Sequence, residues 1–372
     1  MIDKVSQLRS VLRDFPRSMK FCFAYGSGVL KQKSDPSSNM LDLIFVVSNP
    51  YNWHAENMIK NRHHYAQPLK FFGHKAVARV QESWGAEIYY NTLVTTAEGR
   101  NIKYGVVSEV SLVEDLLDWN KLYLAGRLHK PVEVIQEPEK SSPIRTALIQ
   151  NLHSAVHVAL LLLPEHFTED QFFMTIAGLS YHGDFRMIIG EDKDKISNIV
   201  KPQMKNFREL YAPILKNFDP FIDFPLGSNG EITCRQDTSS VTKVHHFNQI
   251  PKTPQMMLVK NWSAGPRSQD TEDCLRAIAN DPDSDELLSL CLRKIVMHSS
   301  LTQSLKGIVT AGLGKSIRYS GKKLSKMMSS LKNKKLLPPS DFSLKTSNVQ
   351  KIAREKAPLK LSNSDKTSEK QV

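Results

Sequence analysis

The sequence lacks the features that mark membrane-spanning, secreted and zinc-binding proteins. Its longest apolar run, around Val158 to Leu163, is too short for a helix that crosses a bilayer. The chain has only four cysteines, and no two of them form a Cys-x-x-Cys pair. Free thiols in a reducing compartment are therefore expected, and a zinc site is not. The N-terminus has no apolar core of a secretory signal, and Asp3 and Asp14 weaken the case for a transit peptide, although residues 5–15 fit an amphipathic helix, structural or targeting.

Acidic residues are absent from a long stretch near the C-terminus. Residues 287–340 contain no Asp or Glu, and eleven Lys or Arg. The whole chain has 50 Lys+Arg, 38 Asp+Glu and a net charge of +12, so this stretch carries most of the excess and residues 1–286 are nearly neutral. A body without excess positive charge argues against a basic groove for nucleic acid. We therefore expect no nucleic-acid partner.

The first part of the chain, residues 1–140, alternates strand-like and helix-like patterns. Four short apolar stretches predict strands at 21–25, 41–47, 86–95 and 101–108. Two longer stretches with helical spacing predict helices at 50–65 and 110–124. The first of these helices starts with Asn49 and Pro50, a capping side chain followed by proline in the first turn. This mixture is typical of an α/β or an α+β domain, and we expect α+β.

The remaining residues divide into four parts. Residues 141–225 are predicted to form a helical domain that begins with a long amphipathic helix, and residues 226–300 complete the body. Residues 301–336 predict a basic amphipathic helix. Residues 337–372 are rich in Ser and Lys with few aromatics, which predicts a disordered tail.

A glycine turn directly follows the first predicted strand. Gly26, Ser27 and Gly28 end this strand, and Asp42 interrupts the apolar run of the next one. Glycines let backbone N–H groups approach a phosphate closely, and Ser27 adds a hydroxyl. An acid inside an otherwise apolar strand must be paired, bound to a metal or placed in a cleft, so Asp42 is a candidate Mg²⁺ ligand. The alternative is an ordinary tight turn beside a strand-edge acid.

This arrangement resembles the nucleotidyltransferase superfamily of the polymerase-β type, in which a Gly-Ser turn precedes an acid-bearing strand. The chain departs from that pattern, because Met40 and Ile44 flank Asp42 where a second acid usually stands. The later strand, around 88–94, also has no Asp. The second metal ligand therefore stays open among Glu87, Asp35 and Asp184.

A polar stripe lies on the helix predicted after the second strand. Its members, which share one helical face by their spacing, are His54, Asn57, Asn61 and His64. Solvent-exposed faces favour Lys, Glu and Gln, whereas Asn and His are poor helix formers. We expect His54 and Asn57 to face a cleft that holds an anion or a base. The alternative is a solvated face.

Longer strings make the resemblance specific. They are Ala24-Tyr-Gly-Ser-Gly-Val, Leu41-Asp-Leu-Ile-Phe-Val, Trp53-His-x-x-Asn, His64-Tyr, Gly85-Ala, Tyr89-Tyr-Asn, Ile102-Lys-Tyr-Gly-Val, Glu114-Asp-Leu-Leu-x-Trp-Asn, Tyr123-x-Ala-Gly-Arg-Leu, Ile176-Ala-Gly-Leu-Ser-Tyr-x-Gly-Asp-Phe-Arg-Met and Gly190-Glu-Asp-Lys. With these strings the chain resembles the mitochondrial CDP-diacylglycerol synthase family, also called translocator assembly and maintenance protein, over roughly residues 20–320.

The resemblance implies a reaction, a fold and a location. The reaction is that of CTP with phosphatidate to give CDP-diacylglycerol and pyrophosphate, with Mg²⁺ as cofactor. The fold is a nucleotidyltransferase domain followed by a helical, winged-helix-like domain. The location is peripheral, on the matrix side of the mitochondrial inner membrane, where the product feeds cardiolipin synthesis.

Candidate site residues follow from that chemistry. A lipid phosphate monoester is already ionised near neutral pH, so cations rather than a strong base should carry catalysis. Under the resemblance, the nucleotide is bound by Tyr25, Gly26, Ser27, Gly28, His54, Asn57 and Lys193, and the metal by Asp42 and Asp184. Lys103 and Arg186 act with Asp42 as catalytic residues. The alternatives are a surface lysine at Lys103 and a structural ion pair between Asp184 and Arg186.

The predicted helix at 301–336 combines apolar residues at helical spacing with many lysines and arginines. Such a helix can lie in an anionic lipid surface, where each basic residue adds about 1 kcal/mol. We expect it to attach the chain to anionic inner-membrane lipids. The alternatives are a core-packed helix, or a tail that binds RNA or a protein.

Two other functions stay open at this point. One is an RNA or protein nucleotidyltransferase on the same fold, and the charge distribution argues against RNA. The other is a non-enzymatic assembly factor for a membrane translocase, which the family's second name suggests.

Overall fold

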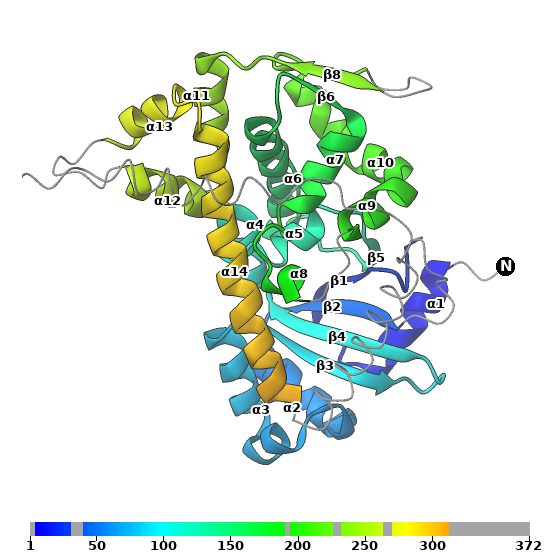
Figure 1. Ribbon diagram of the computed structural model, residues 1–372. Helices are drawn as coiled ribbons and strands as arrows, with labels where there is room; N and C mark the ends of the chain where they lie inside the picture. The colour runs from blue at the N-terminus through cyan, green and yellow to red at the C-terminus, as the bar shows by residue number, and fades with distance from the viewer. Residues whose placement is uncertain (1–3, 31–39, 190–193, 226–231, 263–269, 312–372) are drawn as a thin grey trace, which may run out of the picture. The chain divides into compact units, whose positions relative to one another are not determined.

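The computed structural model describes residues 4–30, 40–189, 194–225, 232–262 and 270–311 (Figure 1). Strands and helices are mixed in the first part and helices dominate afterwards, so the predicted α+β class is confirmed. All four cysteines are free and buried, in keeping with the expected free thiols. No helix in these ranges is long and apolar enough to cross a membrane.

A five-stranded mixed sheet forms the centre of the first part. Its strands are β1 (Met19–Tyr25), β2 (Leu41–Val47), β3 (Ile88–Thr95), β4 (Asn101–Ser108) and β5 (Glu133–Gln136). Their order is β3-β4-β2-β1-β5; β2 and β4 are parallel, and the other neighbours are antiparallel. The first four strands confirm the prediction. β5 has no predicted counterpart, because only one of its four residues, Ile135, is buried.

The two faces of this sheet carry separate hydrophobic cores. Successive residues of a strand point to opposite faces, so Ile44 lies in one core and Leu43 in the other. The helices of the first part are α1 (Lys4–Val11), α2 (Pro50–Lys60), α3 (Gln67–Ser83), α4 (Glu109–Asp118) and α5 (Ala125–Leu128). α1 and α2 contribute to the core on the Leu43 face, and α4 to the core on the Ile44 face.

The second part begins with α6 (Pro143–Leu162), which Ser142 caps through its side chain. It continues with helices α7 (Glu169–Gly178), α8 (Phe185–Ile189), α9 (Lys195–Val200) and α10 (Met204–Leu215) and strands β6 (His166–Thr168), β7 (Ile222–Asp223) and β8 (Thr233–Gln236). These strands form an antiparallel sheet in the order β6-β8-β7. The predicted boundary at 225 falls between β7 and its partner β8, so this sheet continues across it.

The last described helices are α11 (Ser240–Gln249), α12 (Lys252–Trp262), α13 (Thr271–Ala279) and α14 (Ser284–Ala311). α14 crosses the predicted boundary at 300 without a break and reaches back to β3 and α3 (Figure 1). Gln303 Oε1 accepts a hydrogen bond from Ala86 N (2.9 Å), and Lys306 Nζ donates to the carbonyl oxygens of Gln81 (3.2 Å) and Trp84 (2.6 Å).

These contacts correct the start of the predicted membrane helix. Gln303, Lys306 and Thr310 are buried, so residues 301–311 belong to the packed body. The predicted membrane-binding residues 312–336 and the tail 337–372 lie outside the described residues. The described parts of 1–311 belong to one structural unit, so the boundaries at 140 and 300 do not separate independent bodies.

Candidate active site

The Gly-Ser-Gly turn lies directly beside Asp42. Tyr25, the last residue of β1, is the cross-strand partner of Asp42 in β2. Gly26 follows with a φ of 77°, a left-handed value that favours glycine. Its carbonyl oxygen accepts hydrogen bonds from the N–H groups of Val29 (3.1 Å) and Leu30 (3.0 Å). A Cβ on Gly26 would lie 3.6 Å from Asp42 Oδ2, so the turn and the carboxylate are in contact range.

Ser27 and Gly28 complete the turn, and both are half-buried. A Cβ on Gly28 would lie 2.6 Å from the carbonyl oxygen of Met40, closer than side chains approach a backbone. The turn can therefore pack directly on the start of β2 only because Gly28 has no side chain. This packing fixes the turn next to Asp42, as the sequence predicts.

Lys103 extends the pair of Tyr25 and Asp42 to a third strand. It is the cross-strand partner of Asp42 in β4, and its Nζ lies 3.6 Å from Asp42 Oδ1. The same Nζ lies 4.5 Å from the centroid of the Tyr90 ring. We call Tyr25, Asp42 and Lys103 the strand row. The side chains of Lys103 and Asp42 keep 20% and 26% exposure, so a ligand can reach them and replace a contact that is weak at this length.

Arg127 lies between two tyrosine rings beside the strand row. Its guanidinium carbon lies 4.0 Å from the ring centroid of Tyr25 and 5.6 Å from that of Tyr123. Its Nε is buried and has no hydrogen-bond partner within the described residues. Aromatic faces stabilise a guanidinium without neutralising its charge, and a buried N–H without a partner calls for an acceptor. Both features favour an anionic ligand at Arg127.

The charges around Tyr123 show that three cations from different elements lie close together. Burial raises the pKa of the Tyr123 hydroxyl, but the positive charges of Arg127, Arg186 and Lys103 outweigh burial and lower it. These cations come from α5, α8 and β4. We call Lys103, Arg127 and Arg186 the cation cluster. Three cations against two carboxylates, Asp42 and Asp184, leave an excess of positive charge that suits a ligand with several negative charges.

Asp115 positions the segment that carries Tyr123 and Arg127. The predicted helix at 110–124 is too long, since α4 ends at Asp118 and Trp119 adopts a left-handed φ of 52°. The buried carboxylate of Asp115 then accepts hydrogen bonds from backbone N–H groups of the following turn, those of Lys121 (3.0 Å), Tyr123 (3.1 Å), Leu124 (2.8 Å) and Ala125 (3.0 Å). The turn and the start of α5 are therefore tied to α4.

Arg186 and Asp184 form a two-point ion pair. Arg186 Nε donates to Asp184 Oδ1 (2.9 Å) and Nη2 donates to Oδ2 (2.5 Å). Asp184 is almost fully buried. Burial raises the pKa of this carboxyl, but the hydrogen bonds and charge of Arg186 outweigh it, and the net pKa lies below the usual range. Asp184 therefore holds Arg186 in place, and the structure does not leave its carboxylate open for a metal.

The other candidates for a second metal ligand are no better placed. Glu87 lies 3.4 Å from the ammonium of Lys121. Asp35 and the predicted anion contact Lys193 lie outside the described residues. Within the described ranges, no group of three His, Cys, Asp or Glu side chains converges at Asp42. Asp42 is therefore the one acid that the turn and the cation cluster share.

The polar stripe of α2 does not face this site. His54 and Asn57 are fully buried, and their polar atoms bind Gln81, Tyr65 and Tyr104 at 2.8–3.0 Å. Tyr104 follows Lys103 in β4 and so points to the opposite face of the sheet. The predicted cleft beside this stripe is wrong: these residues form a buried network behind the sheet.

Asn61 and His64 belong to the same network. Asn61 Nδ2 donates to Asn57 Oδ1 (2.9 Å), and His64 Nδ1 lies 3.0 Å from the Tyr104 hydroxyl. The predicted helix that carries the stripe is also too long, because α2 ends at Lys60. Asn and His on one helical face correctly indicated that this face is not solvated. These side chains are there because they form hydrogen bonds in the core, not because they line a cleft.

Sequence patterns did not single out Arg127, Tyr123 or Tyr90. A signal was present for all three: Tyr90 lies in the string Tyr89-Tyr-Asn, and the other two lie in Tyr123-x-Ala-Gly-Arg-Leu. Lys130 is a further neighbour, whose Nζ donates to Gly126 O and to Ser180 Oγ (3.0 Å). Burial lowers the pKa of this ammonium, and the charge of Arg127 lowers it further.

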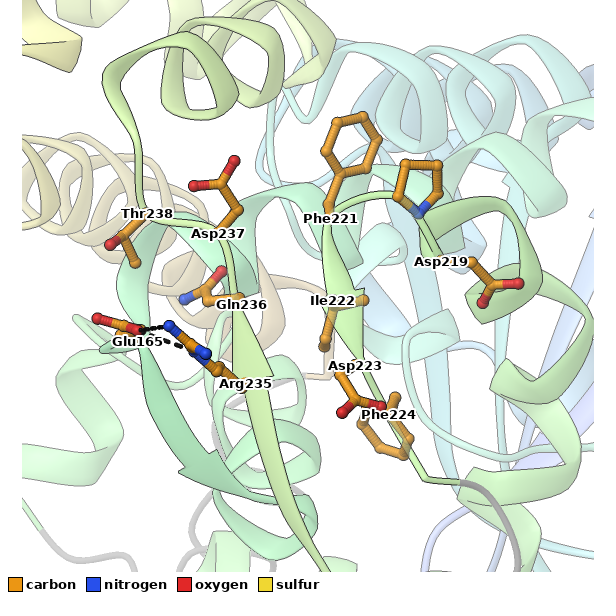
Figure 2. A pocket seen from close by; sticks show the side chains of 11 residues that line it. Glu165, Asp219, Phe221, Ile222, Asp223, Phe224, Arg235, Gln236, Asp237 and Thr238 are labelled. Atoms are coloured by element: carbon orange, nitrogen blue, oxygen red, sulfur yellow. Dashed lines mark hydrogen bonds and ion pairs between the residues drawn. The ribbon is translucent and has the colours of Figure 1, made fainter.

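A surface pocket of about 730 Å³ lies elsewhere, along β7 and β8 (Figure 2). Its charged lining consists of the acids Glu165, Asp219, Asp223 and Asp237 and one base, Arg235. Arg235 is already paired with Glu165 at 3.0 Å, as Figure 2 shows. This excess of acid makes the pocket unsuited to a polyanion, in contrast to the cation cluster.

A glycine turn, two carboxylates and three cations on an α+β scaffold fit a protein that handles phosphate esters. A family model described as phosphatidate cytidylyltransferase, mitochondrial, matches residues 8–326. Relatives of that name are 45% identical over 337 residues in Xenopus laevis (88% of this chain, 96% of the relative) and 46% over 322 residues in Bos taurus (86% and 93%). The relative from Danio rerio is 43% identical over 323 residues (86% and 94%). This chain belongs to the mitochondrial phosphatidate cytidylyltransferase family, which confirms the resemblance.

Proposed function

We propose that this chain is a phosphatidate cytidylyltransferase, which converts CTP and phosphatidate to CDP-diacylglycerol and pyrophosphate. The observation that carries the proposal is the cation cluster around the strand row. Two substrates with several negative charges must meet in this reaction, and these three cations would offset their repulsion. Membership of the family supports the same activity, since its relatives bear this name.

The bond changes need few protein groups. An oxygen of the phosphatidate phosphate attacks the α-phosphorus of CTP, and a new P–O bond forms. The bond from the α-phosphorus to the bridging oxygen breaks, and pyrophosphate leaves with its electron pair. Because the attacking phosphate is ionised near neutral pH, no strong base is required. The protein's task is to position two anions in line and to neutralise their charge.

The residues divide this task by position. The turn at Gly26 and Ser27 offers backbone N–H groups and a hydroxyl to the triphosphate. Lys103 stands next to Asp42 and would neutralise phosphate oxygens on the strand side. Arg127 and Arg186 approach from α5 and α8, where they would hold the second anion. Tyr25 and Asp184 keep these two guanidinium groups in place.

The donor set at the strand row fits Mg²⁺. Asp42 supplies a partly exposed carboxylate, and Mg²⁺ is usually held by one or two carboxylates with phosphate oxygens and water as the remaining ligands. We assign Mg²⁺ binding to Asp42. Asp184 has no part in it, because its carboxylate oxygens bind Arg186. When bound, Mg²⁺ would neutralise phosphate charge. Lys103 would then turn from Asp42 to the substrate phosphates.

The fold and location extend the proposal. We assign the first part to the nucleotidyltransferase type, on the turn and the acid-bearing strand β2. The second part has the order helix, strand, four helices and two strands, with β8 central, and this three-stranded sheet after a helical segment supports a winged-helix-like domain. We place the protein peripherally on the matrix side of the mitochondrial inner membrane, where its product would supply cardiolipin synthesis. Residues 312–336 would contact anionic lipid.

The direct test is a reconstituted reaction. Purified full chain receives CTP labelled at the α-phosphate, Mg²⁺ and vesicles that contain phosphatidate. We expect label in CDP-diacylglycerol and an equal amount of pyrophosphate, both dependent on phosphatidate. Pyrophosphate release that is the same without phosphatidate, or label transferred to RNA or protein instead, would contradict the proposal. Vesicles with diacylglycerol in place of phosphatidate are the matched control.

A further inference from the structure

Two adjacent phenylalanines stand in solvent on α3. Phe71 is 86% exposed and Phe72 is 67% exposed. Their ring centroids lie 5.5 Å apart in an edge-to-face arrangement, so the two rings form one apolar projection. Ile59, near the end of α2, is also 86% exposed. Large apolar side chains with this exposure are unusual on a soluble surface unless something covers them.

The backbone fixes where this projection stands. Gly73 has a left-handed φ of 78° and interrupts α3 directly after the two phenylalanines. Leu69 before the break and Val77 and Ala78 after it are buried. α3 is therefore anchored on both sides of its bend, and the aromatic pair lies at the bend. Nothing lies within 4 Å of a Cβ added to Gly73, so the bend itself is open to its surroundings.

The chain segment that carries the projection has basic residues and no acidic ones. Residues 57–81 contain no Asp or Glu. They contain five Lys or Arg, namely Lys60, Arg62, Lys70, Lys75 and Arg79. All of these except the half-buried Lys70 are exposed. The body of the chain is otherwise nearly neutral, so this acid-free stretch is a local feature of α2 and α3, separate from the basic C-terminal residues.

We propose that Phe71, Phe72 and Ile59, with the surrounding basic residues, are a contact site for an anionic lipid bilayer. Aromatic and aliphatic side chains enter the boundary between head groups and acyl chains, while lysines and arginines bind the anionic head groups. A protein interface fits less well, because the cores of such interfaces are depleted of lysine. The inference rests on the proposed function in one respect: phosphatidate resides in a bilayer, and the enzyme must reach it there.

This site is a second contact, independent of residues 312–336. α14 ends at Ala311, and Lys306 of α14 binds the carbonyl oxygens of Gln81 and Trp84 at the end of α3. The helix that precedes the C-terminal residues in the chain is thus joined to α3. Two contacts on connected elements hold a protein at a surface more firmly than one, because the second forms at high effective concentration.

A fluorescent label locates the contact directly. The four native cysteines are buried, so Phe71→Cys in the full chain can be labelled selectively with an environment-sensitive fluorophore. We expect a blue shift when vesicles of phosphatidylcholine and phosphatidylglycerol, about 3:1, are added. Val241→Cys is the matched control, since Val241 is 80% exposed on α11, and we expect no shift there. An unchanged emission of the label at position 71 would overturn the proposal.

A binding measurement gives the second arm. The double variant Phe71→Ser, Phe72→Ser should partition into the same vesicles about tenfold less than the unchanged chain, whereas Val241→Ser should partition normally. Equal partitioning of the double variant, or a protein partner lost with vesicle binding intact, would refute a bilayer contact. Both variants should use dispersed short-chain phosphatidate equally well. If no form of the chain uses phosphatidate, the proposed function fails while the vesicle measurements still decide this inference.

Discussion

Arg127 and Tyr25 form a cation–ring pair, in which the guanidinium carbon lies 4.0 Å from the ring centroid. This pairing differs from that of Arg186, whose charge is matched by the carboxylate of Asp184. A ring stabilises a guanidinium without cancelling its charge. Arg127 therefore enters the cation cluster with its charge available, and with a buried Nε that has no partner in the described part of the chain.

Arg127→Lys should lower kcat/KM by about 100-fold. Lysine keeps the charge but lacks the planar group that stacks on Tyr25 and the fixed donors that reach an anion. Steady-state rates with CTP and phosphatidate measure the effect. Arg276→Lys, at an exposed position of α13, is the control and should keep normal rates. Equal rates for Arg127→Lys and the unchanged chain would remove Arg127 from the active site.

Asp42→Asn should lower kcat by at least about 100-fold and should lower the apparent affinity for Mg²⁺. The substitution keeps the size of the side chain but removes the only carboxylate that, among the described residues, the turn and the cation cluster share. Rates measured over a range of Mg²⁺ concentrations separate loss of metal binding from loss of folding. Asp223→Asn alters an exposed acid of the pocket in Figure 2 and should leave the rates unchanged. Full activity of Asp42→Asn would exclude Asp42 as a metal ligand.

Asp115→Asn should lower both stability and activity. An amide has one acceptor oxygen, so it cannot serve the four N–H groups that the carboxylate binds. We expect the free energy of unfolding to fall by about 2 kcal/mol, measured by urea denaturation. Because the turn positions Tyr123 and Arg127, kcat/KM should fall under conditions where the variant is still folded. Glu114→Gln, at the exposed neighbouring position, should change neither the free energy of unfolding nor kcat/KM. A normal rate for folded Asp115→Asn would argue against the positioning role of Asp115.

The buried histidine of α2 predicts a loss of stability in mild acid. Burial lowers the pKa of His54 from 6.5 to about 4, although its hydrogen bond to Gln81 opposes this shift. The unfolded chain therefore takes up the proton first as pH falls. The contribution of His54 to the free energy of unfolding is complete above pH 6.5 and declines as the pH falls towards 4. The stability lost reaches on the order of 3 kcal/mol at the acid end of this window.

Urea unfolding from about pH 7 to about pH 5 tests this dependence. His54→Gln should be less stable at neutral pH and should lose less stability on acidification. His63→Gln, at an exposed position next to the network, should keep the full dependence. The stability of His54→Gln will still depend on pH, because burial also lowers the pKa of His129 to about 3. An identical slope for His54→Gln would show that His54 is not the group that titrates.

Two truncations separate the folded end of α14 from the residues that follow it. A chain that ends at Ala311 keeps Gln303 and Lys306 and should unfold at nearly the normal temperature, but bind anionic vesicles more weakly. A chain that ends at Thr302 loses both side chains and their contacts with Ala86 and Trp84. We expect it to be less stable by about 3 kcal/mol or more. Equal thermal unfolding of the two truncated chains, or vesicle sedimentation of the chain that ends at Ala311 equal to that of the full chain, would contradict these expectations.

Local sequence patterns predicted the parts of the site that depend on neighbouring residues. The strand, the glycine turn and the acid in the next strand are close in sequence, and their chemistry requires them to be close in space. The pairing of Asp42 with Lys103 needed the register of β2 against β4, which the spacing of apolar residues does not supply. Arg127 needed the fold of the turn behind Asp115, which no periodicity shows.

Two errors share one physical cause. Helical spacing shows that residues share a face, but not which partner covers that face. The stripe at His54 and Asn57 packs behind the sheet, and the residues from 301 to 311 bury their polar face on α3 and β3. In both places polar side chains are in the core because their hydrogen bonds are satisfied there. A pattern of polarity alone predicts the reverse.

The position of α14 sets an order for the synthesis of this protein. Gln303 binds the backbone of Ala86 and Ile88 at the edge of the first sheet. That edge is among the early parts of the chain to leave the ribosome, whereas its cover is among the last described parts to be made. The edge beside β3 must therefore stay without α14 during most of translation, when a chaperone would have a defined surface to protect.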